Sequence, residues 1–118
     1  MKHGDSKKKF GREKGQRSAF MRSLAANVIL KGSVDTTLAR AKAVRPFVEH
    51  LVTIGRKHDL ASMRVLLSRL PRNAALKLYY EVAPKYAQKS GGYTRIIRQA
   101  KVRMRDGAER ATISLITD

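Results

Sequence analysis

The first 17 residues of the chain carry almost nothing from which a hydrophobic core can be built. Met1 and Phe10 are their only large apolar side chains, while seven basic and two acidic residues give the stretch a net charge of +5. Such a segment buries too little apolar surface to offset the entropy lost on ordering, so we expect residues 1–17 to form a basic arm that is mobile alone. The core must therefore come from residues 18–118, which we expect to form a single globular domain.

Apolar residues recur at helical spacing at the start of this domain. Ser18 is a typical N-cap residue and Gly32 a typical helix stop, so residues 18–31 are predicted to form an amphipathic helix. The short β-branched segment 33–37 is predicted to be a strand. The apolar side of the helix is expected to consist of Phe20, Met21, Leu24, Ala25, Val28 and Ile29.

The longest helical pattern covers residues 38–57, with Thr36 or Thr37 as its N-cap. Pro46 lies inside this pattern and lacks a backbone donor, so we expect a kink or a break near residues 41–45. The apolar arc comprises Ala41, Val44, Phe47, Val48, Leu51, Val52 and Gly55. The opposite arc, a basic outer face, carries Lys42, Arg45, Glu49, Thr53 and Arg56.

Two more helices are predicted before the chain changes character. Asp59 can cap the first, which Pro71 ends, and Asn73 can cap the second, whose continuity Pro84 threatens. The apolar arc of the first is Leu60, Met63, Leu66, Leu67 and Leu70; that of the second is Leu76, Leu78, Tyr79, Val82, Ala83 and Tyr86.

The C-terminal part of the chain has the pattern of a β-hairpin. Residues 93–103 and 110–117 are rich in β-forming residues, and Asp106-Gly107 between them is a hairpin signal. The predicted order is helix, strand, three helices and hairpin. This order indicates an α+β fold with two layers, in which helices cover one face of a small mixed three-stranded sheet and a basic extension precedes the domain.

The charge of the chain points to a polyanionic partner. Lysine and arginine number 26 against nine acidic residues, which gives a net charge of +17. Neutralisation by nucleic acid relieves the self-repulsion of such a chain. A membrane is the competing polyanion, but no apolar run is long enough to span one, no Trp is present, and no secretory signal peptide is apparent, so we expect a soluble protein that is not exported.

Two basic segments are the candidate RNA-binding sites. The first is the arm, residues 1–17, which we expect to become ordered on RNA; the competing interpretation is a merely solvated tail. The second runs from Lys85 to Arg105 with seven basic and no acidic residues, and it contains the sequence Gly91 to Arg95. Its paired glycines permit close approach of the backbone to RNA, while Tyr93 can stack on a base and Arg95 can bind a phosphate; the alternative is a hairpin entry turn with Tyr93 in the core.

Other residues with chemical potential favour structural roles. Tyr79, Tyr80, Tyr86 and Tyr93 invite comparison with a stacking platform for single strands, but the helical position of Tyr79 and Tyr86 favours core packing. His3, His50 and His58 show no metal-binding spacing, and the acidic residues are not paired. With no cysteine, no nucleotide-binding motif and no catalytic constellation, the sequence predicts neither an enzyme nor a cofactor or metal site.

Several motifs resemble the bacterial large-subunit ribosomal protein L17 family over nearly the whole chain. The carriers of the resemblance are Met1-Lys2-His3, residues 17–26 (RSAFMRSLAA), 35–45 (DTTLARAKAVR), 49–55 (EHLVTIG) and 91–96 (GGYTRI). Gln16, Ala39 and Pro46 depart from the residues common in the family, which affects details of helix starts but not the resemblance.

The resemblance implies a small domain of the large (50S) ribosomal subunit that binds 23S-type rRNA, supports subunit assembly and translation, and adjoins other ribosomal proteins around the peptide exit side. It also implies no catalysis, no cofactor and no small-molecule substrate. A bacterial cytoplasmic ribosome is the expected location, and an organelle that encodes its own copy is the alternative. An architectural DNA-binding protein and a nuclease are the alternatives. The residues expected to contact rRNA are Lys2, His3, Lys7, Lys8, Lys9, Arg12, Lys14, Arg17, Arg22, Thr36, Thr37, Arg40, Lys42, Arg45, Gly91, Gly92, Tyr93, Thr94, Arg95 and Arg98.

Overall fold

The first helix begins earlier than its capping signal suggested. A computed structural model describes residues 14–89, 91–102 and 107–116, and in it α1 runs over Lys14–Lys31. Ser18 lies inside this helix rather than at its N-cap, because the preceding residues are mostly good helix formers. Gly32 ends it as predicted: its φ of 83° is left-handed, and its N–H donates to the Val28 carbonyl at 2.8 Å.

The second helix confirms its predicted cap but not its predicted break. β1 covers Ser33–Thr37 and leads directly into α2, Leu38–Arg56, where the Thr37 side chain accepts a hydrogen bond from the Arg40 N–H at 3.3 Å. α2 continues through Pro46 as one helix. Pro46 is exposed, as is Lys42, whose carbonyl loses its helical donor, so water can satisfy that group.

The third helix, α3 (Leu60–Arg69), starts with a reciprocal cap. The Ser62 N–H donates to the Asp59 carboxylate at 2.7 Å, and the Asp59 N–H donates to the Ser62 hydroxyl at 3.1 Å. The predicted apolar arc is only partly correct: Leu66 and Leu70 are buried, but Leu60 is 64% exposed and Leu67 is also exposed. The capping residue Ser62 takes a buried position instead, because this short helix meets its neighbours along a narrow stripe.

This cap makes the stability of the protein pH-dependent in the acid range. Hydrogen bonds from Ser62, above all from its backbone N–H, lower the pKa of the Asp59 carboxyl below its ordinary 3.8. A pKa lowered by folding stabilises the native state above the ordinary value, and this contribution disappears as the pH falls through the folded-state pKa. We therefore expect Asp59→Ala to lower the melting temperature near neutral pH, and the difference from the parent protein to shrink below pH 3.8. Thermal unfolding at a series of pH values measures this, with exposed Glu81→Ala as the charge control. A difference independent of pH would contradict it.

The last helical segment changes its winding before Pro84. α4 spans Arg72–Lys77, followed by a π-helical turn, Leu78–Val82, and a 3₁₀ turn, Ala83–Tyr86. Asn73, predicted as the N-cap, lies in the first turn of α4; the N-cap is Pro71. The Ala83 N–H reaches the Leu78 carbonyl five residues earlier, and this wider turn accommodates the proline that follows.

The three strands form an antiparallel sheet in the order β1-β3-β2, where β2 is Thr94–Val102 and β3 is Glu109–Leu115. The expectation of a mixed sheet was wrong because β3 lies between β1 and β2, which are parallel to each other but never neighbours. The β2–β3 register shifts between Arg98 and Val102. Of the predicted hairpin turn, Asp106 lies outside the described residues, and Gly107 has a φ of 64°.

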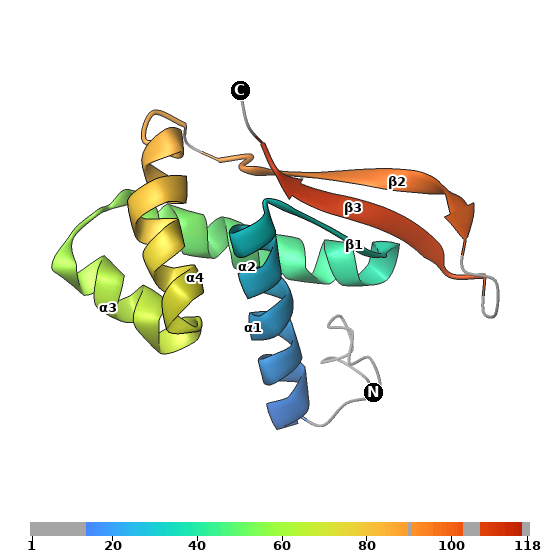
Figure 1. Cartoon of the computed structure of the whole chain (residues 1–118), viewed down its shortest axis with the longest axis horizontal. Helices are drawn as coiled ribbons and strands as arrows, with labels where there is room; N and C mark the ends of the chain where they lie inside the picture. The colour runs from blue at the N-terminus through green and yellow to red at the C-terminus, as the bar shows by residue number, and fades with distance from the viewer. Residues whose placement is uncertain (1–13, 90, 103–106, 117–118) are drawn as a thin grey trace, which may run out of the picture.

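Helices cover one face of the sheet, as predicted. α2 contacts all three strands and α1 contacts β1 and β3 (Figure 1). α3 packs on α2, α4 packs on α1, and α3 and α4 pack on each other. Ala111, Ile113 and Leu115 point from β3 into the core. The predicted arcs of α1 and α2 are largely buried, although Phe20, Met21 and Phe47 are only partly buried at the margin of the core.

Candidate nucleic-acid interface

The outer face of α2 is basic, as predicted, but fewer of the predicted residues are exposed on it. Lys42, Arg45 and His50 are exposed on it. Glu49 and Arg56, which the helical wheel also placed there, are half-buried and bind the chain segment that leads into β2. The Glu49 carboxylate is therefore bound to Thr94 and does not pair with the exposed cations of this face.

Glu49 and Arg45 hold the first residue of β2 against α2. The Thr94 N–H and the Thr94 hydroxyl both donate to Glu49 Oε2, at 2.9 and 2.7 Å. Arg45 Nη2 donates to the Thr94 carbonyl at a longer 3.4 Å. Thr94 is buried and its hydroxyl is occupied, so the expected contact of this side chain with RNA is not available in this structure.

Tyr93 belongs to the core and not to a stacking site. Its side chain is 1% exposed, and its ring packs at a tilt against Tyr86 with centroids 5.2 Å apart. Its hydroxyl accepts from Arg56 Nη1 at 2.7 Å and donates to the Lys89 carbonyl at 3.3 Å. The interpretation as a hairpin entry turn is therefore correct, and the expectation that Tyr93 stacks on a base is wrong because no face of the ring is free.

Arg56 has a structural function that the sequence did not reveal. Besides Tyr93, it donates from Nη2 to the Ala87 carbonyl at 3.1 Å, while its buried Nε has no hydrogen-bond partner. The guanidinium thus joins the end of α2 to the segment before β2. No local pattern distinguishes this arginine from its exposed neighbours on the same helix.

The N-terminal end of α2 combines local roles with exposed charge. Thr37 is occupied as the N-cap, and the Arg40 guanidinium lies over the Phe20 ring, 5.1 Å from its centroid. This cation–π contact joins α2 to α1. Thr36 is half-buried opposite Ala111 in the sheet.

The remaining predicted residues divide between α1, the arm and β2. Arg22 is exposed on α1 and Arg17 is half-buried, while Lys14 begins the helix. Arg95 and Arg98 are both exposed on β2, and Gly92, with a φ of 69°, makes the turn that Gly91 leads into. Lys2, His3, Lys7, Lys8, Lys9 and Arg12 lie outside the described residues.

The rings of His58, Tyr79 and Tyr80 form a cluster. Tyr79 and Tyr86 are buried, as predicted, whereas Tyr80 is 63% exposed. His58, in a left-handed conformation with φ 51°, stacks on Tyr79 with centroids 4.0 Å apart. Within the described part of the chain, no group of three or more His, Cys, Asp or Glu side chains is placed to hold a metal ion. In the same residues, no helix is long and apolar enough to cross a bilayer.

Comparison with known proteins places this architecture in a family. The family model described as ribosomal protein L17 matches residues 20–116, which include all the strands and most of α1. The chain belongs to the ribosomal protein L17 family. Membership of the L17 family makes it a structural, non-enzymatic protein, in agreement with the absence of catalytic motifs from its sequence.

Full-length relatives support the same assignment. The chain is 44% identical over 117 residues to the large ribosomal subunit protein bL17 of Sulfurihydrogenibium sp. (strain YO3AOP1), covering 98% of this chain and 97% of that protein. It is 40% identical to the protein of the same name from Fusobacterium nucleatum, covering 98% and 100%. For that of Staphylococcus aureus (strain JH9), the identity is 42% and the coverage 92% and 98%. The similarity therefore extends to the N-terminal segment before the family-model match.

Proposed function

We propose that this protein is a structural component of the large ribosomal subunit that binds 23S-type rRNA directly and supports subunit assembly and translation. The observation that carries the proposal is the similarity, over nearly the full length of both chains, to proteins named for the large ribosomal subunit. The net charge of +17 supplies the physical reason, because such a chain is stabilised by contact with a polyanion.

The proposed RNA contacts come from two parts of the chain. The domain offers exposed cations on separate elements: Arg22 on α1, Lys42 and Arg45 on α2, and Arg95 and Arg98 on β2. The N-terminal arm supplies further lysines and arginines, and we propose that it becomes ordered when it binds between phosphates. The half-buried Arg40 contributes by positioning α2 on α1 rather than as a free cation.

This assignment sets the expected partners and location. Large-subunit rRNA is the main partner, and neighbouring large-subunit proteins are the others. The protein then acts in the bacterial cytoplasm as part of the ribosome. It uses no cofactor in this function, because positioning and charge neutralisation require none.

Sucrose-gradient fractionation of a cell lysate tests the proposal. The protein is expected to migrate with large subunits and to stay with them through a wash at high salt, because a ribosomal component is held by many contacts at once. Migration at the top of the gradient, or release together with loosely bound factors, would contradict the proposal.

Binding to duplex DNA is the alternative function from which rRNA binding must be distinguished. An architectural DNA-binding protein needs a recognition helix or a wedge residue free to enter a groove, whereas the apolar arcs of α1 and α2 are committed to the core. Binding to an rRNA fragment should therefore exceed binding to random duplex DNA at physiological salt. Equal affinities would favour the DNA alternative.

A further inference from the structure

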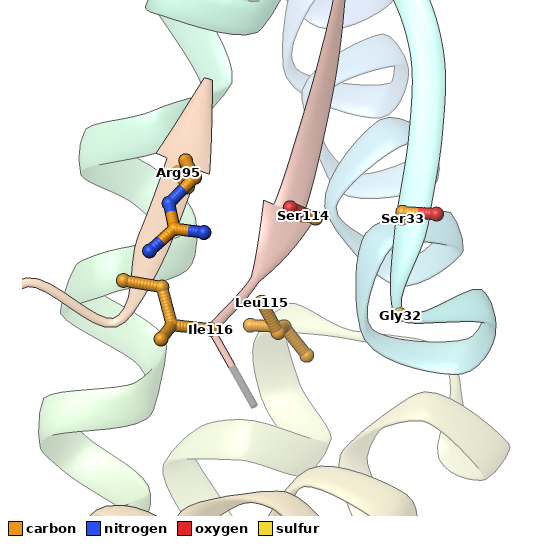
Figure 2. A pocket seen from close by; sticks show the side chains of 6 residues that line it. All are labelled: Gly32, Ser33, Arg95, Ser114, Leu115 and Ile116. Carbon is orange, nitrogen blue, oxygen red and sulfur yellow. The ribbon is translucent and has the colours of Figure 1, made fainter. Parts of the chain in front are cut away.

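A hollow of about 340 Å³ opens on the face of the sheet opposite the helices. It is lined by Gly32, Ser33, Arg95, Ser114, Leu115 and Ile116 (Figure 2). None of the residues that line the hollow belongs to a helix, and in Figure 1 α1 and α2 lie on the other side of the sheet. Sequence reasoning did not predict it, because residues from three separate strands or strand ends form it.

Three polar side chains form one row across this hollow. In the sheet register Ser114 of β3 pairs with Ser33 of β1 on one side and with Arg95 of β2 on the other. Figure 2 shows the three residues in this order on neighbouring strands. Since neighbouring strands lie about 4.8 Å apart, the row is about 10 Å long. In Figure 2 the Ser114 hydroxyl lies on the side of Arg95, whereas the Ser33 hydroxyl points away from Ser114 and turns toward the row by rotation of its side chain. Two hydroxyls and one guanidinium can then donate to a single phosphate group above the row.

The acidic group on the same face belongs to the next row and is already bound. Asp35 Oδ1 accepts from the Thr112 hydroxyl at 2.6 Å, and Thr112 Oγ1 accepts from Gln99 Nε2 at 2.9 Å. This chain of hydrogen bonds crosses all three strands and holds the Asp35 carboxylate in its own row. Among residues 14–89, 91–102 and 107–116, no carboxylate lines the hollow and the Arg95 guanidinium has no ion-pair partner.

Backbone hydrogen bonds keep the floor of the hollow in place. The Leu115 N–H donates to the Gly32 carbonyl at 2.8 Å, and the Ile116 N–H donates to the Tyr93 carbonyl at 2.9 Å. They close the ends of all three strands around β3. Because Thr94 is held by Glu49 on the helical side, the next residue of the strand, Arg95, is directed to the open side. The backbone positions of the row are fixed in this way, so binding an anion orders only the three side chains.

We propose that this hollow binds one phosphate group, with Arg95 donating to two of its oxygens and the hydroxyls of Ser33 and Ser114 donating to the others. The identification of the phosphate as part of an RNA backbone rests on the proposed rRNA-binding function. A free phosphate ion has the same chemistry, and the experiments below separate the two sources. The geometry of the row itself does not depend on which source supplies the anion.

Binding of an rRNA fragment by single variants tests the RNA form of the proposal. Arg95→Gln should weaken binding about tenfold at fixed salt and reduce the slope of log affinity against log salt by about 0.7 to 0.9. The double variant Ser33→Ala, Ser114→Ala should weaken binding with little change of slope, because hydroxyls displace no counterions. The triple variant, which adds Arg95→Gln to the two serine changes, should lose less binding free energy than the sum of the separate losses, because all three groups hold one phosphate.

The matched control removes one positive charge from a distant surface. Arg64, exposed on α3, lies away from the hollow and outside the proposed RNA contacts, so Arg64→Gln measures the effect of net charge alone. If Arg95→Gln and Arg64→Gln change affinity and slope equally, RNA does not occupy the hollow. Circular dichroism of each variant shows that the fold is retained.

Titration of the full chain with inorganic phosphate, followed by NMR of the backbone amides, tests the anion site without RNA. Saturable shifts at Ser33, Arg95 and Ser114 that disappear in Arg95→Gln are the expected result. If rRNA abolishes these phosphate-induced shifts, the natural ligand is an RNA phosphate. If the shifts occur but the protein binds no rRNA, the hollow is a site for free phosphate, and the proposed rRNA-binding function is wrong while the anion site is retained. Absence of localised shifts, together with equal effects of the Arg95 and Arg64 variants, overturns the proposal.

Discussion

Raising the salt concentration from about 50 to about 200 mM is expected to weaken binding of the protein to a large-subunit rRNA fragment by about 10⁴- to 10⁵-fold. The reason is counterion release: if about ten basic side chains meet phosphates, the slope of log affinity against log salt is about −7 to −9. The chain has the charge to do this, with 26 lysines and arginines against nine acidic residues. Fluorescence anisotropy of a labelled fragment at several salt concentrations measures the slope, and a slope near zero would contradict electrostatic binding.

The same experiment separates the arm from the domain. Deleting residues 1–13 leaves α1 whole, because the helix begins at Lys14, and it removes five basic and two acidic residues. If all five cations meet phosphates, the magnitude of the slope should fall by about 3.5 to 4.5. A matched control with the same loss of three net charges is the triple glutamine variant of exposed Lys57, Arg64 and Arg72. Equal slopes for the deletion and this control would show that the arm is not a specific RNA contact.

Replacing Leu66 by alanine is expected to lower the free energy of unfolding by about 2 to 5 kcal/mol. Leu66 is completely buried between α3 and α2, and its Cδ1 lies 3.6 Å from the position that a β-carbon on Gly55 would occupy. Leu66 thus packs directly on α2 beside Gly55, so its truncation leaves a cavity between the two helices. Urea unfolding monitored by circular dichroism measures the loss.

A leucine on the same helix provides the control for this prediction. Leu60 is 64% exposed, although the helical wheel placed it on the same apolar arc as Leu66. Leu60→Ala should therefore change the free energy of unfolding by no more than about 0.5 kcal/mol. Similar losses for the two variants would mean that α3 packs as the wheel predicted, with Leu60 in the core.

Most of the secondary structure was predictable because its signals are local. Thr37 and Asp59 as N-caps, Gly32 as a helix stop and the alternation of residues 111–115 act through neighbours within four positions in the chain. Predictions failed where local signals competed. Ser18 is not an N-cap because the helix formers before it extend α1 to Lys14. Pro46 does not break α2 because the missing hydrogen bond lies on an exposed side of the helix.

The candidate interface was predictable only in part. Exposed cations such as Lys42, Arg45 and Arg95 followed from charge and helical or strand position. Burial of Tyr93 in the segment Gly91 to Arg95 did not follow, because the same residues suit both an RNA-binding turn and the entry to a core strand. The deciding partners, Arg56 and Glu49, lie more than 30 positions away in the chain.

The sequence by itself determined the basic character of the protein, the order of its helices and strands, and the residues from which its core is built. Charge is a sum over the chain, and apolar periodicity acts within one element, so neither requires knowledge of the tertiary contacts. Only the tertiary structure decided which polar side chains are used internally and which face outward. Arg56, Glu49, Thr94 and Tyr93 are joined by hydrogen bonds between residues 37 and 45 positions apart. The row Ser33–Ser114–Arg95 likewise depends on the strand register, which places three distant residues beside one another.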